Sequence, residues 1–208
     1  MSSNEDLIKA IADLDEDHAL EIVKELIKTK SATDIINIAR EGMQLVGDKF
    51  ANKEFFLADL IFSAEIFQEI MTILESKLTT EKVSFIGKVV IGTVKNDIHD
   101  IGKNIILSLL RAAGFEVVDL GVDVPVEKFI EAVKREKPKV LGLSGLLTIA
   151  IEEMKNVIDA LKANNLREDI KVIVGGGPMD ASVRDYVGAD ANSQDAVLGV
   201  NKIREFFD

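Results

Sequence analysis

The chain has 208 residues, with 25 lysines and arginines against 36 aspartates and glutamates, so its formal net charge is −11. Hydrophobic residues make up 47% and charged residues 29%, a composition typical of a globular protein. The absence of cysteine excludes disulfides, thiolate metal sites and cysteine nucleophiles. The acidic balance argues against nucleic-acid binding, and no apolar run reaches the length of a membrane span. We therefore expect a cytoplasmic protein with neither a nucleic-acid nor a membrane partner.

Residues 1–80 are predicted to be helical, because they contain no proline and carry glycine only at Gly42 and Gly47. Apolar residues recur at the spacing of an amphipathic helix in four successive segments. Ser31 and Asp34 resemble a capping box at the start of the third segment, and the fourth runs over about residues 54–78. Four helices joined by short turns predict a four-helix bundle over residues 1–80.

Residues 88–208 alternate between strand and helix patterns. The strand-like runs show little polar alternation, which indicates a parallel sheet covered by helices on both faces. We predict an α/β domain with a flavodoxin-like or Rossmann-like doubly wound parallel sheet, joined to the bundle by a linker at residues 81–87. The expected strands are 88–94, 115–120, 140–143, 171–174 and 189–191, and the clearest helices are 102–113, 151–161 and 195–207.

Open α/β sheets bind ligands at the carboxyl ends of their strands, which directs attention to the loop after the first strand. That loop presents His99 with Asp97 two residues before it. A neutral imidazole is a good ligand for a transition metal, and a carboxylate on its second nitrogen strengthens it as a donor. By themselves these two residues are better explained as a solvated loop histidine beside a helix-capping aspartate. His18 has no motif around it, and we expect it at the surface near a helix start.

The spacing of three motifs changes this interpretation. The pattern Asp97-x-His99-x-x-Gly102 is separated by 41 residues from Ser144-x-Leu146, and 28 more residues precede Gly175-Gly176. This arrangement resembles the cobalamin-binding signature D-x-H-x-x-G, S-x-L and G-G. The helical part is similar to the cap of the cobalamin module of methionine synthase, at Gly42-Met43, Val46-Gly47-Asp48, Phe50 and Phe56-Leu57. Over residues 5–207 the chain resembles the stand-alone corrinoid proteins of methyltransferase systems.

The resemblance implies that cobalamin binds with its own base displaced, and that His99 is the metal ligand on the lower face of cobalt. Asp97 would hold the second ring nitrogen, so His99 and Asp97 are the residues implied to act in the chemistry. In methionine synthase a serine completes this relay, but Ala150 stands at the matching position here. Thr148 or a water molecule is the candidate substitute.

The resemblance also implies contacts to the rest of the cofactor. Glycines would let the backbone approach the displaced nucleotide tail, Ser144 would bond its base, and Phe50 and Leu57 would cover the upper face. Turn chemistry for the glycines, a helix N-cap role for Ser144 and bundle core for Phe50 and Leu57 are the alternatives. The implied loop contacts are Asn96, Asp97, Ile98, His99, Asp100, Gly102, Ser144, Leu146, Thr148, Gly175, Gly176, Gly177 and Ser193.

By this resemblance the protein carries a methyl group on cobalt, with methylcobalamin or a related corrinoid as its cofactor. Its partners would be a substrate-specific methyltransferase, an acceptor methyltransferase and a reductive activase, and it would have no complete activity alone. One alternative is a cobalamin-dependent sensor that relies on a partner for its output. Others are the small subunit of an adenosylcobalamin mutase, which lacks this helical cap, and a flavodoxin-like domain with another ligand. No motif names the methyl donor, the acceptor or the oligomeric state.

Overall fold

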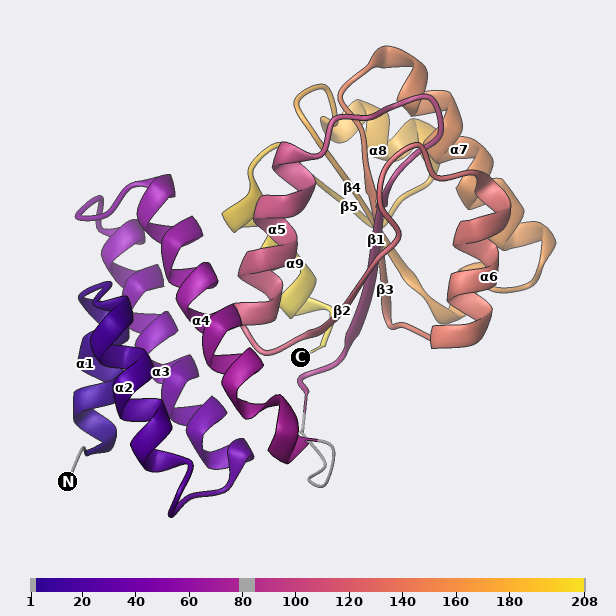
Figure 1. Ribbon diagram of the computed structural model, residues 1–208. Helices are drawn as coiled ribbons and strands as arrows, with labels where there is room; N and C mark the ends of the chain where they lie inside the picture. The colour runs from indigo at the N-terminus through magenta and orange to yellow at the C-terminus, as the bar shows by residue number, and fades with distance from the viewer. Residues whose placement is uncertain (1–2, 79–84, 208) are drawn as a thin grey trace. The chain divides into compact units, whose positions relative to one another are not determined.

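The computed structural model describes residues 3–78 and 85–207 (Figure 1). The chain divides into two compact units, a helical unit of residues 1–85 with 111–114 and an α/β unit of residues 86–110 with 115–208. The predicted linker at 81–87 falls largely on residues outside the described part of the chain. The linker and the domain boundaries at 80 and 88 therefore stay predictions.

Four helices of the described residues form the helical unit: α1 (Asn4–Ala12), α2 (Glu16–Leu26), α3 (Ala32–Ala51) and α4 (Leu57–Leu78). The first three begin at Ser3, Asp15 and Ser31, whose side-chain oxygens each accept a backbone N–H three residues on. α1 packs on α2 and α3, and α4 packs on α2 and α3, which is the neighbour pattern of a four-helix bundle. The predicted helical region is therefore confirmed.

The start of α4 differs from the predicted position near residue 54. Lys53 has a left-handed backbone with φ of 64°, so the chain reverses there and residues 54–56 complete the turn. The Asp59 carboxylate then accepts the Phe56 N–H at 2.7 Å and caps the helix that begins at Leu57. His18 lies in the first turn of α2 with a side chain 56% exposed, as expected.

The α/β unit contains a parallel sheet in which the described strands follow the order β2-β1-β3-β4-β5. Helices α6, α7 and α8 lie on one face, and α5 and α9 on the other (Figure 1). The doubly wound sheet is thus confirmed. The elements are β1 (Lys88–Thr93), α5 (Ile101–Ala112), β2 (Glu116–Asp119), α6 (Val126–Glu136), β3 (Val140–Ser144), α7 (Thr148–Ala163), β4 (Lys171–Gly175), α8 (Ala181–Val187), β5 (Ala191–Ser193) and α9 (Ala196–Glu205).

Two boundaries in this unit were predicted wrongly. α7 begins at Thr148 and not at 151, so its first turn closes directly over the loop after β3. β5 spans Ala191–Ser193 and not 189–191, because Gly188 ends α8 with φ of 82° and Asp190 is occupied by bonds to Val172 before the ladder starts. Within the described residues, no helix has the length and apolar character needed to cross a membrane.

The strand order places the topological switch point between β1 and β3. From β1 the chain moves outward to β2 and then returns across β1 to β3, so the loops after β1 and β3 diverge to opposite faces. Ligands of open α/β sheets bind at such a point, outside the carboxyl ends of the strands.

Candidate functional site

The three sequence motifs meet at one row of the sheet. Strand register pairs Thr93 with Ser144, Ser144 with Gly175, and Gly175 with Ser193. These four residues end β1, β3, β4 and β5, so the second and third motifs begin at this row and the first begins four residues after it, at Asp97. The long gaps between the motifs are the lengths of the intervening helix-and-strand units. The prediction that the motifs lie together at strand ends is confirmed.

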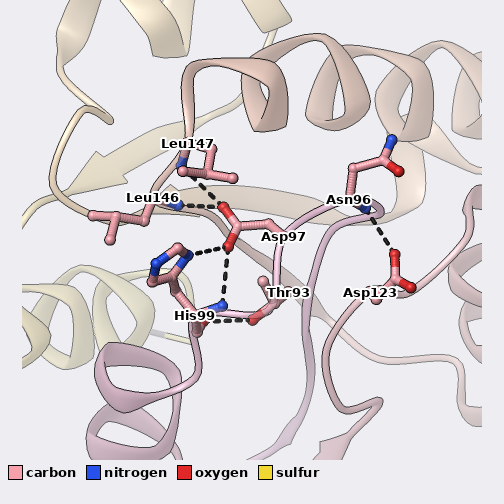
Figure 2. A network of polar contacts seen from close by, with 7 residues as sticks. All are labelled: Thr93, Asn96, Asp97, His99, Asp123, Leu146 and Leu147. Carbon is pink, nitrogen blue, oxygen red and sulfur yellow. Dashed lines mark hydrogen bonds and ion pairs between the residues drawn. The ribbon is translucent and has the colours of Figure 1, made fainter.

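Asp97 and His99 form a side-chain pair in the loop after β1 (Figure 2). His99 Nδ1 lies 2.7 Å from Asp97 Oδ1, and the His99 backbone N–H donates to the same oxygen at 3.0 Å. The Asp97 side chain is fully buried, whereas that of His99 is 47% exposed. A carboxylate only accepts hydrogen bonds, so Nδ1 carries the ring proton. Nε2, which has no partner among the described residues, is left as a lone-pair donor pointing away from Asp97.

The second oxygen of Asp97 is held by backbone donors. Leu146 N–H and Leu147 N–H donate to Oδ2 at 2.6 and 3.0 Å, just before the first turn of α7. Burial raises the pKa of Asp97, but the bonds from Leu147, His99 and Leu146 together outweigh burial and lower it to about 2. Asp97 is therefore an anion at neutral pH.

These backbone donors replace the side-chain relay. Ala150 is buried and has no hydroxyl, and Thr148 is exposed. Among the described residues, the bonds to the Asp97 carboxylate come from His99, Leu146 and Leu147, so Thr148 does not substitute for the missing serine. The sequence did not point to Leu147, because a backbone N–H is the same in every residue except proline.

A buried threonine also supports the histidine loop. Thr93 ends β1 with no exposed surface, and its Oγ1 donates to the His99 carbonyl at 3.2 Å (Figure 2). This hydrogen bond holds the backbone of His99 at the end of β1, in addition to the bonds that Asp97 makes to the same residue. A polar residue at the end of an otherwise apolar strand was its one signal in the sequence.

A cleft opens beside the motif row, on the face of the sheet that carries α5 and α9. It holds about 570 Å³ of space, part of which is open to solvent, and aliphatic residues of β1, β4, α5 and α9 line it: Ile91, Ile173, Ile106 and Ile203. Of the predicted site residues, it is lined by Gly102, Ser144, Gly175, Gly176 and Ser193. Gly177 is exposed outside the cleft, Asn96, Ile98, His99, Asp100 and Leu146 lie in the loops after β1 and β3, and Thr148 is the first residue of α7.

Two family models match this chain, one over the α/β part and one over the helical part. A family model described as a B12 binding domain matches residues 87–202, and a second with the same description matches residues 4–75. Trimethylamine corrinoid protein 1 of Methanosarcina acetivorans is 35% identical over 214 residues, which cover 98% of each chain. The chain belongs to the family of B12-binding corrinoid proteins. The resemblance noted in the sequence is confirmed.

Two solved structures resemble this corrinoid protein over nearly its whole length. A cobalamin-binding protein from Desulfitobacterium hafniense is 40% identical, with a TM-score of 0.76 and coverage of 99% of both chains. A chain of the methanol:cobalamin methyltransferase complex from Methanosarcina barkeri is 30% identical, with a TM-score of 0.89 and coverage of 97% of this chain and 78% of that one. The family relationship therefore includes the helical residues as well as the α/β unit.

The residues of this corrinoid protein fit a metal held in an organic ring. The described residues contain no group of three histidine, cysteine, aspartate or glutamate side chains that could hold a bare ion. His99 instead offers one outward nitrogen, which suits a metal whose other ligands come from a cofactor. Five large aliphatic side chains in the His99 loop, in the loop after β3 and in the first turns of α5 and α7 lie 42–76% exposed: Ile98, Ile101, Leu146, Leu147 and Ile149. Such a surface fits the flat, largely apolar face of a corrin.

The cleft glycines of the corrinoid protein divide into two kinds. A Cβ on Gly102 would meet nothing within 4 Å, and one on Gly175 would approach only Ser193 O, at 3.5 Å. These two glycines leave room in the cleft. A Cβ on Gly176, where φ is 131°, would lie 1.8 Å from Gly145 O, and one on Gly145 would lie 2.6 Å from Ala150 Cβ. Gly145 and Gly176 are therefore required by the packing of the chain itself, whatever ligand is bound.

The predicted cap residues lie around the turn between α3 and α4. Phe50 is half-buried in the last turn of α3, and Leu57, the first residue of α4, is 42% exposed. Phe56 beside it is 76% exposed. Leu57 is thus not part of the bundle core, and this corrinoid protein displays an apolar surface at that turn. Its contact with the cofactor stays a prediction.

Proposed function

We propose that this corrinoid protein binds cobalamin or a related corrinoid with His99 as the lower ligand of cobalt, and carries a methyl group between two methyltransferases. One would be substrate-specific and the other would serve the acceptor, with a reductive activase as a third partner. The names of the relatives support this role, since one is a trimethylamine corrinoid protein and another belongs to a methanol:cobalamin methyltransferase complex. The corrinoid supplies the cobalt atom on which the methyl group travels.

The observation that carries the proposal is the orientation of His99. Asp97 Oδ1 accepts the Nδ1 proton, which fixes the tautomer and leaves the lone pair on Nε2 facing out of the loop. A negative charge on the far side of the ring strengthens Nε2 as a donor. Asp97 would hold the ring in this orientation, so that Nε2 faces the position that the metal would take.

The cleft and the apolar loops would hold the remainder of the cofactor. The aliphatic lining and the open space at Gly102 and Gly175 suit the displaced nucleotide tail, with Ser144 and Ser193 as polar contacts inside the cleft. Phe50 and Leu57 are the residues that the resemblance implies for the upper face of the corrin. Leu146, Thr148 and Gly177 would contact the cofactor at the rim.

The choice of methyl donor would reside in the partner enzyme. Relatives of similar identity to this chain are named for different donors, trimethylamine at 35% and methanol at 30%. We infer that the chain carries the methyl group in the same way whatever its donor, and that the partner enzyme selects the donor.

Histidine labelling tests the ligand assignment, because the chain contains two histidines. Protein reconstituted with cobalamin is reduced to cobalt(II) and examined by electron paramagnetic resonance with ¹⁴N- and ¹⁵N-histidine. We expect a nitrogen hyperfine pattern that changes with the label, persists in His18→Ala and is lost in His99→Ala. A pattern unaffected by the label would show that the cofactor keeps its own base, and would overturn the proposal.

A second measurement separates a methyl carrier from a cobalamin-dependent sensor. The reconstituted protein is incubated with methyltransferases encoded beside it and with their methylated substrates, and methyl transfer to the corrinoid is followed by its visible spectrum. A carrier becomes methylated at a rate that depends on the methyltransferase. A sensor would bind the corrinoid with the same spectrum but would not accept the methyl group from any of them.

A further inference from the structure

The loop after β2 contacts the His99 loop through a residue that neither the sequence motifs nor the proposed cofactor contacts include. Asp123 Oδ1 accepts the backbone N–H of Asn96 at 2.8 Å, as Figure 2 shows. The backbone N–H of Asp123 donates to the carbonyl of Asp97 at 2.9 Å. Asp123 therefore holds the backbone on both sides of the peptide that joins Asn96 to Asp97.

The two loops run together as an extension of the sheet. Val94 and Val124 form an isolated parallel bridge, and the Val124 N–H donates to the Thr93 carbonyl at 3.0 Å. The side chain of Asn96 is held as well, because its Nδ2 donates to Glu153 Oε1 of α7 at 3.3 Å. The position of the Asn96–Asp97 peptide is thus set by both neighbouring loops and not by the His99 loop alone.

The location of this peptide matters because Asp97 supports the ring of His99. The Asp97 carboxylate must reach Leu146 N–H, Leu147 N–H and His99 Nδ1 at once, at 2.6, 3.0 and 2.7 Å. Hydrogen bonds weaken steeply when distances and angles depart from these values. A shift of the Asp97 backbone by a fraction of an ångström would loosen this set of bonds and release the imidazole from its fixed orientation.

The backbone conformation at position 123 explains why aspartate serves there. Asp123 has φ of 52° and Asn96 has φ of 65°, so both are left-handed. Glycine, asparagine and aspartate tolerate this conformation best, and of these only asparagine and aspartate also supply an acceptor oxygen. The Asp123 carboxylate forms no ion pair within the described residues, so its acceptor oxygen and not its charge makes the contact.

We propose that Asp123 is a positioning residue for His99, acting through the Asn96–Asp97 peptide. The proposal rests on the proposed function in that it gives Asp123 a part in presenting the ligand nitrogen to cobalt. The geometric part can be tested on the apoprotein, because the bonds of Asp123 to Asn96 and Asp97 lie within the chain itself.

Three substitutions separate the contributions of Asp123. Asp123→Asn keeps the acceptor and the left-handed backbone, Asp123→Gly keeps the backbone but removes the acceptor, and Asp123→Ala removes both. Asn165→Ala is the matched control, because Asn165 has φ of 55° and lies between α7 and the amino end of β4, whereas His99 follows the carboxyl end of β1. It imposes the same backbone strain far from His99.

The first measurement uses apoprotein labelled with ¹⁵N-histidine, in which His18→Ala assigns the His99 signals. We expect the Nδ1 proton of His99 to exchange with water at least tenfold faster in Asp123→Gly and Asp123→Ala than in the wild type. Asp123→Asn and Asn165→Ala should match the wild type within about twofold. Wild-type exchange in Asp123→Gly would overturn the proposal.

The second measurement uses the cobalamin-loaded protein and cobalt(II) electron paramagnetic resonance. We expect the histidine-ligated fraction to fall by at least half in Asp123→Gly and to be restored in Asp123→Asn. Full ligation in Asp123→Gly would contradict the positioning role. If the wild type itself showed no histidine ligation, the proposed function would fail, while the exchange rates in the apoprotein would still decide whether Asp123 positions His99.

Discussion

Asp97 is a buried carboxylate that pairs with no lysine or arginine among the described residues, yet it is strongly ionised. Three backbone N–H groups and the His99 ring donate to its two oxygens, which satisfies most of its acceptor capacity. Such bonds to an ion are roughly twice as strong as neutral ones, and together they offset the cost of burial. The aspartate can therefore hold the histidine ring without becoming protonated itself.

The low pKa of Asp97 predicts a specific loss of stability in acid. Its pKa is lowered from 3.8 to about 2 in the folded protein, so the ionised form favours folding above the unfolded pKa. This contribution, about 2 kcal/mol, is lost as the pH falls from about 5 to about 2. Urea unfolding of the wild type and Asp97→Asn across this range measures it. The wild type should lose about 2 kcal/mol more than the variant; parallel curves would contradict the assignment.

The glycines of the cleft predict opposite effects of the same substitution. Gly102→Ala adds a methyl group in open space within α5, so it should raise the stability of the apoprotein by about 0.5–1 kcal/mol. The same methyl group enters the cleft and should weaken corrinoid binding. Gly176→Ala would force a Cβ to 1.8 Å from Gly145 O and should cost about 2 kcal/mol or more.

Denaturant unfolding of the apoproteins and titration with cobalamin distinguish these effects. A Gly102→Ala protein that is stabilised but binds cobalamin as tightly as the wild type would place the cofactor tail outside this cleft. If Gly176→Ala were as stable as the wild type, the turn after β4 would relax around the added methyl group without a loss of folding free energy.

At the scale of the elements, the residues just before α7 supply two of the four hydrogen bonds that Asp97 accepts. The first N–H groups at a helix N-terminus have no partner within the helix, and the helix dipole favours a negative charge there. Leu146 and Leu147 precede α7 directly, and their N–H groups point to Asp97 Oδ2. Because Ala150 packs against the position of Gly145, the helix approaches the loop closely enough for this contact.

Removing one of these donors should raise the pKa of Asp97. Leu147 has φ of −82° and ψ of 150°, which is near the conformation that proline adopts, so Leu147→Pro deletes the N–H with little change of backbone. A hydrogen bond to an ion contributes about 1.5–3 kcal/mol, and we expect the pKa of Asp97 to rise by about 1 or more. Carbon-13 NMR of the aspartate carboxyls across pH measures it. Leu147→Ala, which keeps the N–H, is the control and should match the wild type.

At the scale of the whole molecule, the cofactor would join loops that are far apart in the sequence. The cleft draws residues from β1, α5, β3, β4 and the segment between β5 and α9, all within the α/β unit. A ligand that binds these elements only in the folded state stabilises that state by mass action.

Cobalamin should therefore raise the unfolding temperature of the protein. At a free concentration one hundred times its dissociation constant, it contributes about 2.7 kcal/mol, which corresponds to about 5–10 °C. Scanning calorimetry with and without cobalamin measures the shift. His18→Ala should respond as the wild type does, whereas His99→Ala should respond less at the same cobalamin concentration. An equal shift in both variants would mean that His99 adds nothing to binding.

The sequence by itself determined the fold class, the order of the elements, the place of the three motifs and the family. These properties depend on local periodicity and on residue spacing, since each motif follows a strand and each gap is one helix-and-strand unit. Boundaries were less accurate: α4 begins at Leu57 because of the left-handed turn at Lys53, and β5 begins at Ala191 because Asp190 is held by Val172.

Only the tertiary structure decided which groups support His99. Leu146 and Leu147 act through backbone N–H groups that every residue except proline possesses, so their identity carries no signal. Asp123 comes from a loop 24 residues after His99 in the sequence and reaches it through another peptide. Gly102 and Gly176 are the same residue type, yet one leaves space for a ligand and the other for its own chain. Such roles depend on distances between segments, and those distances exist only once the sheet has formed.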